Sequence, residues 1–232
     1  MNAAEFFENS VFFGVTVSLL AYGLGMLMYR KWKLAILNPL MISVVVTIIV
    51  LSVAHIDYDI YNAGAKYLSY LLTPATVCLA VPLYEKLELL RRSWKAILLG
   101  IGSGVLSALG CILAMSLLFG LSHEDYVSLL PKSITTAIGM GVSEELGGSV
   151  TLTVAVIIIT GVFGNMAGAA VCKLFHIEEP IAKGVALGTS AHAIGTAKAM
   201  EMGETEGAVS GLSIAVSGLL TVICASVFAS FL

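Results

Sequence analysis

The stretch Gly188-Thr189-Ser190-Ala191-His192-Ala193-Ile194-Gly195-Thr196-Ala197-Lys198 carries glycines, hydroxyl groups, a histidine and a lysine between long apolar segments. Ionisable groups at membrane depth are costly, so they usually face a bundle interior or a water-filled cavity. Broken helices rich in small and polar residues also build midplane binding sites in transporters. The stretch therefore predicts a polar site inside a membrane protein.

The composition of the whole chain supports a membrane protein. The 232 residues are 58% hydrophobic and 12% charged, with a mean hydropathy of +0.98, whereas soluble domains carry about 25% charged residues. We expect residues 1–232 to form a single integral membrane domain in the lipid bilayer. No basic patch indicates nucleic acid, no enzyme motif is found, and the cysteine spacing matches no metal site. We therefore expect no catalytic residue, cofactor or metal.

Apolar segments of bilayer length predict an all-α polytopic membrane protein, since a span needs roughly 20 residues. The seven predicted spans are Val11–Tyr29, Asn38–Ala54, Tyr61–Tyr84, Ala96–Phe119, Val150–Cys172, Lys183–Met200 and Ala208–Phe231. The segment 131–148 is too polar and too rich in glycine for an ordinary span. It is predicted to be a re-entrant helical segment, with an eighth span as the alternative.

The distribution of basic residues favours seven spans plus the re-entrant segment, because cytoplasmic loops carry an excess of Lys and Arg. With the N-terminus outside, nine basic loop residues lie inside and only Lys66 lies outside. The nine are Arg30, Lys31, Lys33, Lys86, Arg91, Arg92, Lys95, Lys173 and Lys183. Eight spans would move Lys173 and Lys183 outside and give seven against three. The loop 85–95 is cytoplasmic in both topologies.

The chain also has the pattern of an internal duplication. Thr76 and His192 are separated by 192 − 76 = 116 residues, which is half of the 232-residue chain. The segments 38–119 and 150–231 each hold three predicted spans and enter the membrane from opposite sides. Inverted three-span repeats of this kind are common in secondary transporters. We therefore expect two related broken helices, one in each repeat.

The polar segment of the first repeat lies between residues 72 and 84. Pro74 and Pro82 each remove a helix hydrogen bond, and the freed carbonyl groups need other partners in a membrane. The hydroxyls of Thr73 and Thr76, or a bound substrate, would supply them. The segment is predicted to be unwound at a site, with a simple helix kink as the alternative.

Candidate substrate-binding residues are the hydroxyl, amide and cationic groups of the polar segments. They are Thr73, Thr76, Lys132, Ser133, Thr135, Thr136, Asn165, Ser190, His192, Thr196 and Lys198. The predicted helix breaks are at Pro74, Pro82, Gly188 and Gly195. A short helix beginning near Ser133 would direct its positive end at an anion, with Lys132 beside it. Lys132 could instead be a solvated interfacial lysine, and Lys198 could extend to the membrane surface.

Gly164 and Gly168 form a G-x-x-x-G pattern. This pattern permits close contact between helices and is predicted to serve packing. Asn165 lies between them, and its amide should find a polar partner inside the bundle.

Several of these stretches resemble the LrgB/CidB family of membrane proteins. They are Asn38-Pro39, Leu71–Tyr84, Pro131–Thr136, Thr160–Gly164 and Gly188–Lys198. The resemblance implies a bacterial inner-membrane protein paired with a small LrgA/CidA-type membrane protein. That pair is described as holin/antiholin-like, modulating murein hydrolase activity and cell lysis. Plastid relatives look like glycolate/glycerate carriers, and bacterial relatives are linked to small carboxylates such as pyruvate.

Two functions of different classes follow. The paired polar breaks favour a secondary transporter of small monocarboxylates, in which Thr76, His192 and Thr196 contact substrate oxygens and Lys132 supplies positive potential. His192, with an ordinary pKa near 6.5, would be a candidate proton carrier. The alternative is a holin/antiholin-like protein, or a regulatory partner that transports nothing. We expect a homo-oligomer, with a dimer by analogy to elevator-like carriers.

Overall fold

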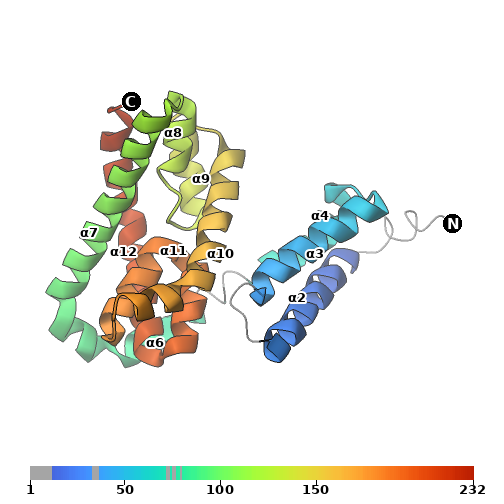
Figure 1. The fold of residues 1–232 in the computed structure, drawn as a ribbon, viewed down its shortest axis with the longest axis horizontal. Helices are drawn as coiled ribbons and strands as arrows, with labels where there is room; N and C mark the ends of the chain where they lie inside the picture. The colour runs from blue at the N-terminus through green and yellow to red at the C-terminus, as the bar shows by residue number, and fades with distance from the viewer. Residues whose placement is uncertain (1–11, 33–36, 72–73, 75–76, 79) are drawn as a thin grey trace. The chain divides into compact units, whose positions relative to one another are not determined.

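The structure, a computed structural model, describes residues 12–32, 37–71, 74, 77–78 and 80–232. The described residues form helices and no strands, which confirms the predicted all-helical class. The chain divides into two compact units, Met1–Cys78 and Leu79–Leu232, which we describe separately (Figure 1).

The first unit is a group of packed helices. It contains α2 (Phe13–Trp32), α3 (Pro39–Ala54) and α4 (Tyr58–Ser69). Asn38 caps α3, because its Oδ1 accepts a hydrogen bond from a backbone N–H of the first turn (2.9 Å). Gly14 and Gly25 let α2 approach its neighbours, since a Cβ at either position would collide with the backbone of α4 or α3.

The second unit is built around a central helix. It contains α6 (Ala80–Glu85), α7 (Leu87–Phe119), α8 (His123–Leu129), α9 (Thr136–Glu145), α10 (Val150–Leu174), α11 (Pro180–Met202) and α12 (Glu204–Ala229). α11 packs against α7, α10 and α12. Gly164 and Gly168 of α10 face Ala191 and Leu187 of α11, and Gly188 of α11 faces α12. The predicted packing role of the G-x-x-x-G pattern is confirmed.

α8 and α9 form a helical hairpin that starts and ends at the same end of the unit (Figure 1). Pro131 lies opposite Gly139 near the turn, and Ser128 and Ser143 both contact Thr153 at the open end. The helices have 7 and 10 residues. Neither is long enough to cross a bilayer, which takes roughly 20 residues. The hairpin covers most of the segment 131–148 predicted to be re-entrant, but it begins earlier, at His123, and α9 ends at Glu145.

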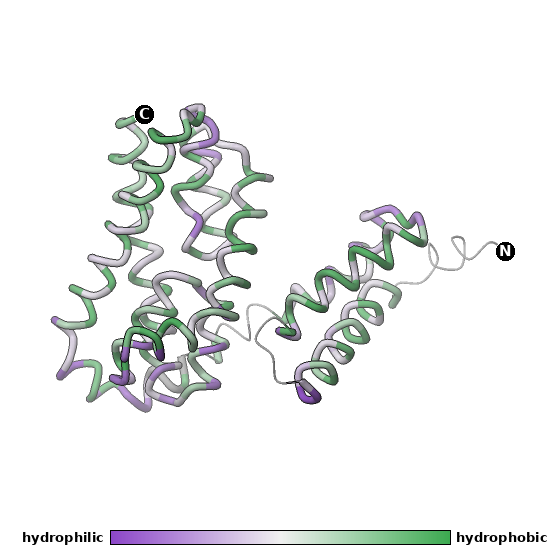
Figure 2. The backbone as a smooth tube through the Cα atoms, in the orientation of Figure 1, coloured by the Kyte–Doolittle hydropathy of each residue, from purple (hydrophilic) through white to green (hydrophobic). Residues whose placement is uncertain are grey.

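Among the described residues, four helices, α2, α7, α10 and α12, are long and apolar enough to cross a membrane, and α3 is apolar but shorter. Figure 2 shows hydrophobic residues along these helices and hydrophilic ones gathered mainly near helix ends. Large apolar side chains point outward, such as Leu99 (74% exposed) and Phe163 (69%). Such a surface suits contact with lipid, because soluble monomers rarely expose large contiguous apolar patches.

One helix boundary differs from the prediction. The segment 61–84, predicted to be interrupted between residues 72 and 84, contains the end of α4 at Ser69 and the start of α6 at Ala80. The loop expected at 85–95 is wrong, because α7 begins at Leu87 and runs for 33 residues. Lys, Arg and Glu are good helix formers, so the helix extends beyond its apolar part. Hydropathy does not detect such a polar extension.

Replacing Gly188 by alanine is expected to destabilise the second unit. The added Cβ would meet the Ser210 carbonyl and lie 2.8 Å from the Ser213 Cβ, and overpacking of this kind costs about 1–3 kcal/mol. Thermal unfolding in detergent should give a lower Tm for Gly188→Ala. Gly102→Ala is the control, because a Cβ there meets nothing within 4 Å. Equal Tm values for the two variants would contradict the close packing of α11 on α12.

Candidate functional site

α11 is interrupted at Ala191 (φ −133°, ψ 19°) and His192 (φ 42°, ψ −139°). A positive φ is strained for a residue with a side chain, so contacts must hold it. The His192 ring is buried, and its Nε2 donates a hydrogen bond to the Ile157 carbonyl oxygen of α10 (3.0 Å). Gly161 makes room for this ring, because a Cβ there would lie 2.7 Å from its Cε1 and Nε2.

Neighbouring side chains bind the backbone around the break. The Asn165 Nδ2 of α10 donates to the Ile194 carbonyl oxygen (2.7 Å). The Thr196 hydroxyl donates to the His192 carbonyl oxygen (3.1 Å) and lies 2.7 Å from the Ser210 Oγ of α12. The structure therefore brings His192, Asn165 and Thr196 together as residues that hold an irregular backbone.

A cavity of about 450 Å³ lies beside the broken helix. Its polar lining comes from Lys132, Thr160 and Ser190, and apolar side chains such as Ala167 and Leu187 supply much of the rest. Ile159 and Phe163 also line it but are largely exposed, so the cavity is open toward the lipid-facing surface. Lys132 comes from the turn between α8 and α9, whereas Ser190 precedes the break in α11. Two predicted site residues from distant parts of the sequence thus line one cavity, and no acidic side chain is among its lining residues.

The remaining predicted residues of the hairpin surround Lys132. Its Nζ donates to the Ser133 Oγ (3.0 Å). α9 begins at Thr136 rather than near Ser133, and Thr135 occupies the N-cap position without a side-chain capping bond. These three hydroxyl residues are not among those that line the cavity.

Lys198 lies at the far end of α11. Its Nζ forms an ion pair with the Glu201 carboxylate (2.7 Å), so its charge is already compensated. Gly188 and Gly195 flank the break, but the non-helical dihedral angles are at the residues between them. Gly188 serves close packing against α12. Gly195 accommodates the break itself, because a Cβ there would collide with the Ala191 Cβ and the Leu187 carbonyl oxygen of its own helix.

The predicted polar segment of the first repeat is described only in part. Thr73 and Thr76 lie outside the described residues. Pro74 is helical, and Pro82 lies within α6. The pairing of this segment with the break in α11 stays a prediction.

Sequence reasoning missed a network of hydroxyl groups at the open end of the hairpin. The Thr153 Oγ1 lies 2.7 Å from the Ser143 Oγ and 2.9 Å from the Ser128 carbonyl oxygen. The Ser128 Oγ in turn accepts a hydrogen bond from the Ser149 N–H (2.7 Å). The network ties α8 and α9 to the start of α10, and thereby fixes the hairpin that carries Lys132. Its only sequence signal is the Ser149/Thr153 spacing of one helical turn.

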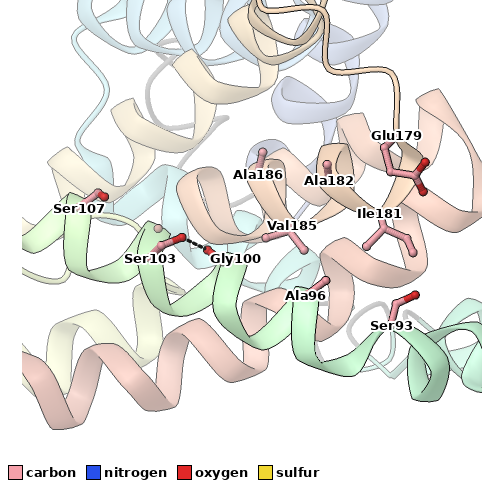
Figure 3. A pocket seen from close by; sticks show the side chains of 11 residues that line it. Ser93, Ala96, Gly100, Ser103, Ser107, Glu179, Ile181, Ala182, Val185 and Ala186 are labelled. Atoms are coloured by element: carbon pink, nitrogen blue, oxygen red, sulfur yellow. Dashed lines mark hydrogen bonds between the residues drawn. The ribbon is translucent and has the colours of Figure 1, made fainter.

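A second cavity, of about 610 Å³, lies between α7 and α11 (Figure 3). Ser93, Ser103 and Ser107 line one wall, and Glu179 lies at its edge. The Ser103 hydroxyl bonds within its own helix, to the Gly100 carbonyl oxygen (2.9 Å). This mainly apolar groove contains a carboxylate and no cation, so it suits an anion less well than the cavity at Lys132.

Replacing His192 by glycine is expected to leave the protein more stable than replacing it by alanine. Both changes remove the ring and its hydrogen bond, but only glycine adopts these dihedral angles without strain. At a position inside a regular helix, the alanine variant would be the more stable one, because glycine is about 1 kcal/mol less favourable than alanine there. Thermal unfolding of both variants in detergent measures the order. A higher Tm for His192→Ala would mean that the helix is not broken there.

Comparison with known proteins agrees with the resemblance described above. Residues 18–231 match the model of the LrgB-like family. Proteins named antiholin-like protein LrgB from Bacillus mycoides (strain KBAB4) and Bacillus cereus (strain B4264) are each 36% identical, over 95% of this chain and 96% of their own. No solved structure matches. Together with its apolar helices, these matches identify a multi-pass membrane protein, and the chain belongs to the LrgB-like family.

Proposed function

We propose that this protein acts in the bacterial plasma membrane as an antiholin-like protein, and that its molecular activity is the transfer of a small monocarboxylate across the membrane. The two statements have different support. The antiholin-like role is supported by the names of relatives that match almost the whole chain. The carrier activity is supported by the cavity that Lys132 and Ser190 share.

The charge of Lys132 carries the proposal of an anion site. In the described part of the chain this ammonium group has a neutral partner, the Ser133 hydroxyl, and no carboxylate within ion-pair distance. An uncompensated charge within a membrane protein is costly, and a bound carboxylate would compensate it. The Thr160 hydroxyl lines the same cavity and would donate to a further substrate oxygen. The Ser190 hydroxyl lines it too, but donates to the Ala186 carbonyl oxygen (2.6 Å) and would have to give up that bond to bind substrate. The apolar walls suit the short carbon body of a two- or three-carbon acid.

The broken helix gives the proposed carrier a movable element. Ser190 lies two residues before His192, so a change of backbone conformation at the break would move its hydroxyl in the cavity. Broken helices of this kind hold the substrate sites of many secondary transporters. His192 bonds to α10 and Thr196 contacts α12, so a change of backbone conformation at the break would also change how α11 packs against these two helices. His192 is also the candidate for carrying a coupled proton.

The proposed topology has seven spans, a re-entrant α8–α9 hairpin and the N-terminus outside. It is supported by the lengths of α8 and α9 and by the return of the hairpin to the end from which it starts (Figure 1). The basic loop residues then gather on the cytoplasmic side, as expected. We further propose inverted repeats over 38–119 and 150–231, a homo-oligomer, and an LrgA/CidA-type membrane protein as the partner in the antiholin-like role.

Purified protein in liposomes is expected to take up a radiolabelled monocarboxylate such as pyruvate or glycolate. Lys132→Gln should reduce the uptake at least about tenfold, because losing a charge-assisted contact of 1.5–3 kcal/mol has an effect of that order. Lys95→Gln is the control, since Lys95 is an exposed lysine of the same unit that lies beside the Trp94 ring. Equal uptake by the two variants, or none by the unaltered protein, would refute the carrier activity.

The antiholin-like role is tested separately, in a Bacillus strain that lacks its own LrgB protein. Expression of this chain should restore the normal murein hydrolase activity and lysis of the culture. If the Lys132→Gln variant reaches the membrane but does not restore murein hydrolase activity and lysis, anion transfer underlies the antiholin-like role. Full restoration by a variant without uptake would separate the two functions and favour a regulatory protein.

A further inference from the structure

Another cavity, of about 420 Å³, lies where α10 turns into α11. α10 ends in a tight turn in which the Ile177 N–H bonds to the Cys172 carbonyl oxygen (2.8 Å) and His176 is left-handed (φ 54°). Lys173, His176 and Glu178 line the cavity from this turn, and Lys183 lines it from the first turns of α11.

This cavity adjoins the one that contains Lys132. Cys172 and Ile177 line both of them, so these two side chains stand between the α10–α11 turn and the cavity at Ser190 and Lys132. The Cys172 side chain is only 4% exposed, so passage from one cavity to the other requires it to move aside.

The charges around the outer cavity favour anions. Lys173 and Lys183 face it together with one carboxylate, that of Glu178. Neither lysine forms an ion pair within the described residues. The neighbouring carboxylate, Glu179, lies instead at the groove between α7 and α11 (Figure 3). Because its lysines outnumber its carboxylate, the cavity has a net positive charge, which raises the local concentration of anions.

We propose that the cavity at Lys173, His176 and Lys183 is the entrance through which small dissolved anions reach Lys132. This inference rests on the proposed anion site and adds its route of access. An anion is attracted between the two lysines at the membrane surface and then passes Cys172. In the seven-span topology the α10–α11 turn is cytoplasmic, so the entrance opens to the cell interior.

Cys172 provides a natural reporter for this route, because it lies at the junction of the two cavities. A variant with Cys78, Cys111 and Cys224 replaced by serine retains Cys172 as its single thiol. We would measure its modification by a small anionic methanethiosulfonate (the ethylsulfonate) and by the cationic trimethylammonium reagent. Because both reagents react with the same thiol, a change in its reactivity alters both rates equally. The ratio of the two rates therefore reports the electrostatic potential near Cys172.

The positive charges of Lys173 and Lys183 are expected to raise the rate at which the anionic reagent modifies Cys172 and to lower the rate for the cationic reagent. Lys173→Gln with Lys183→Gln should lower the anion/cation ratio several-fold, and high salt should lower it in the unaltered lysine background. Lys95→Gln is the matched control and should leave the ratio unchanged. The proposed entrance would be overturned if the anion/cation ratio were the same with and without the two lysines, or if Cys172 reacted with neither reagent.

Lipid composition distinguishes a dissolved anion from an anionic lipid headgroup, which would use the same lysines. In liposomes of phosphatidylcholine alone or with phosphatidylglycerol, we expect Cys172 to react at similar rates. Protection from both reagents by phosphatidylglycerol would assign the cavity to a lipid and overturn the proposal. The labelling experiment does not depend on transport. If Lys132→Gln abolishes uptake while the labelling ratio is normal, the proposed entrance stands. If uptake depends on Lys132 but the labelling ratio does not depend on Lys173 and Lys183, the carrier activity stands and the entrance is refuted.

Discussion

A helix that is interrupted inside a membrane protein must have its backbone groups bonded by the protein, because lipid offers no hydrogen bonds. In this chain the requirement arises at Ala191 and His192 of α11. The Asn165 amide and the Thr196 hydroxyl meet it by donating to the carbonyl oxygens of Ile194 and His192. The His192 ring adds a bond from α11 to the Ile157 carbonyl oxygen of α10. α10 must therefore lie close to α11, and Gly164 permits that approach. One backbone irregularity thus determines how this pair of helices packs.

The position of Lys132 depends on neutral groups that lie away from it. Short helices have little stability of their own, so the hairpin of α8 and α9 needs anchoring. The buried hydroxyls of Ser128, Ser143 and Thr153 provide it, because they bond both helices to the start of α10. α10 then connects the two halves of the site, since it holds the hairpin at one end and the broken helix along its length.

Much of the fold could be predicted from the sequence because lipid imposes strict rules on composition and length. A helix facing lipid has no use for the residues between Gly188 and Lys198, so their presence indicated a polar interior. The hydroxyl network could not be predicted, since Ser and Thr in apolar helices commonly bond their own backbone. Nor could the pairing of Lys198 with Glu201, because both a bound anion and a neighbouring carboxylate satisfy a lysine equally well.

The contact between Gly161 and the imidazole of His192 has a consequence for how this family can change over time. The two positions share one small volume, in which a methyl group and the ring do not fit together. A substitution at either position alone therefore leaves a clash or a void. Homologous chains should therefore differ at positions 161 and 192 together or at neither of them.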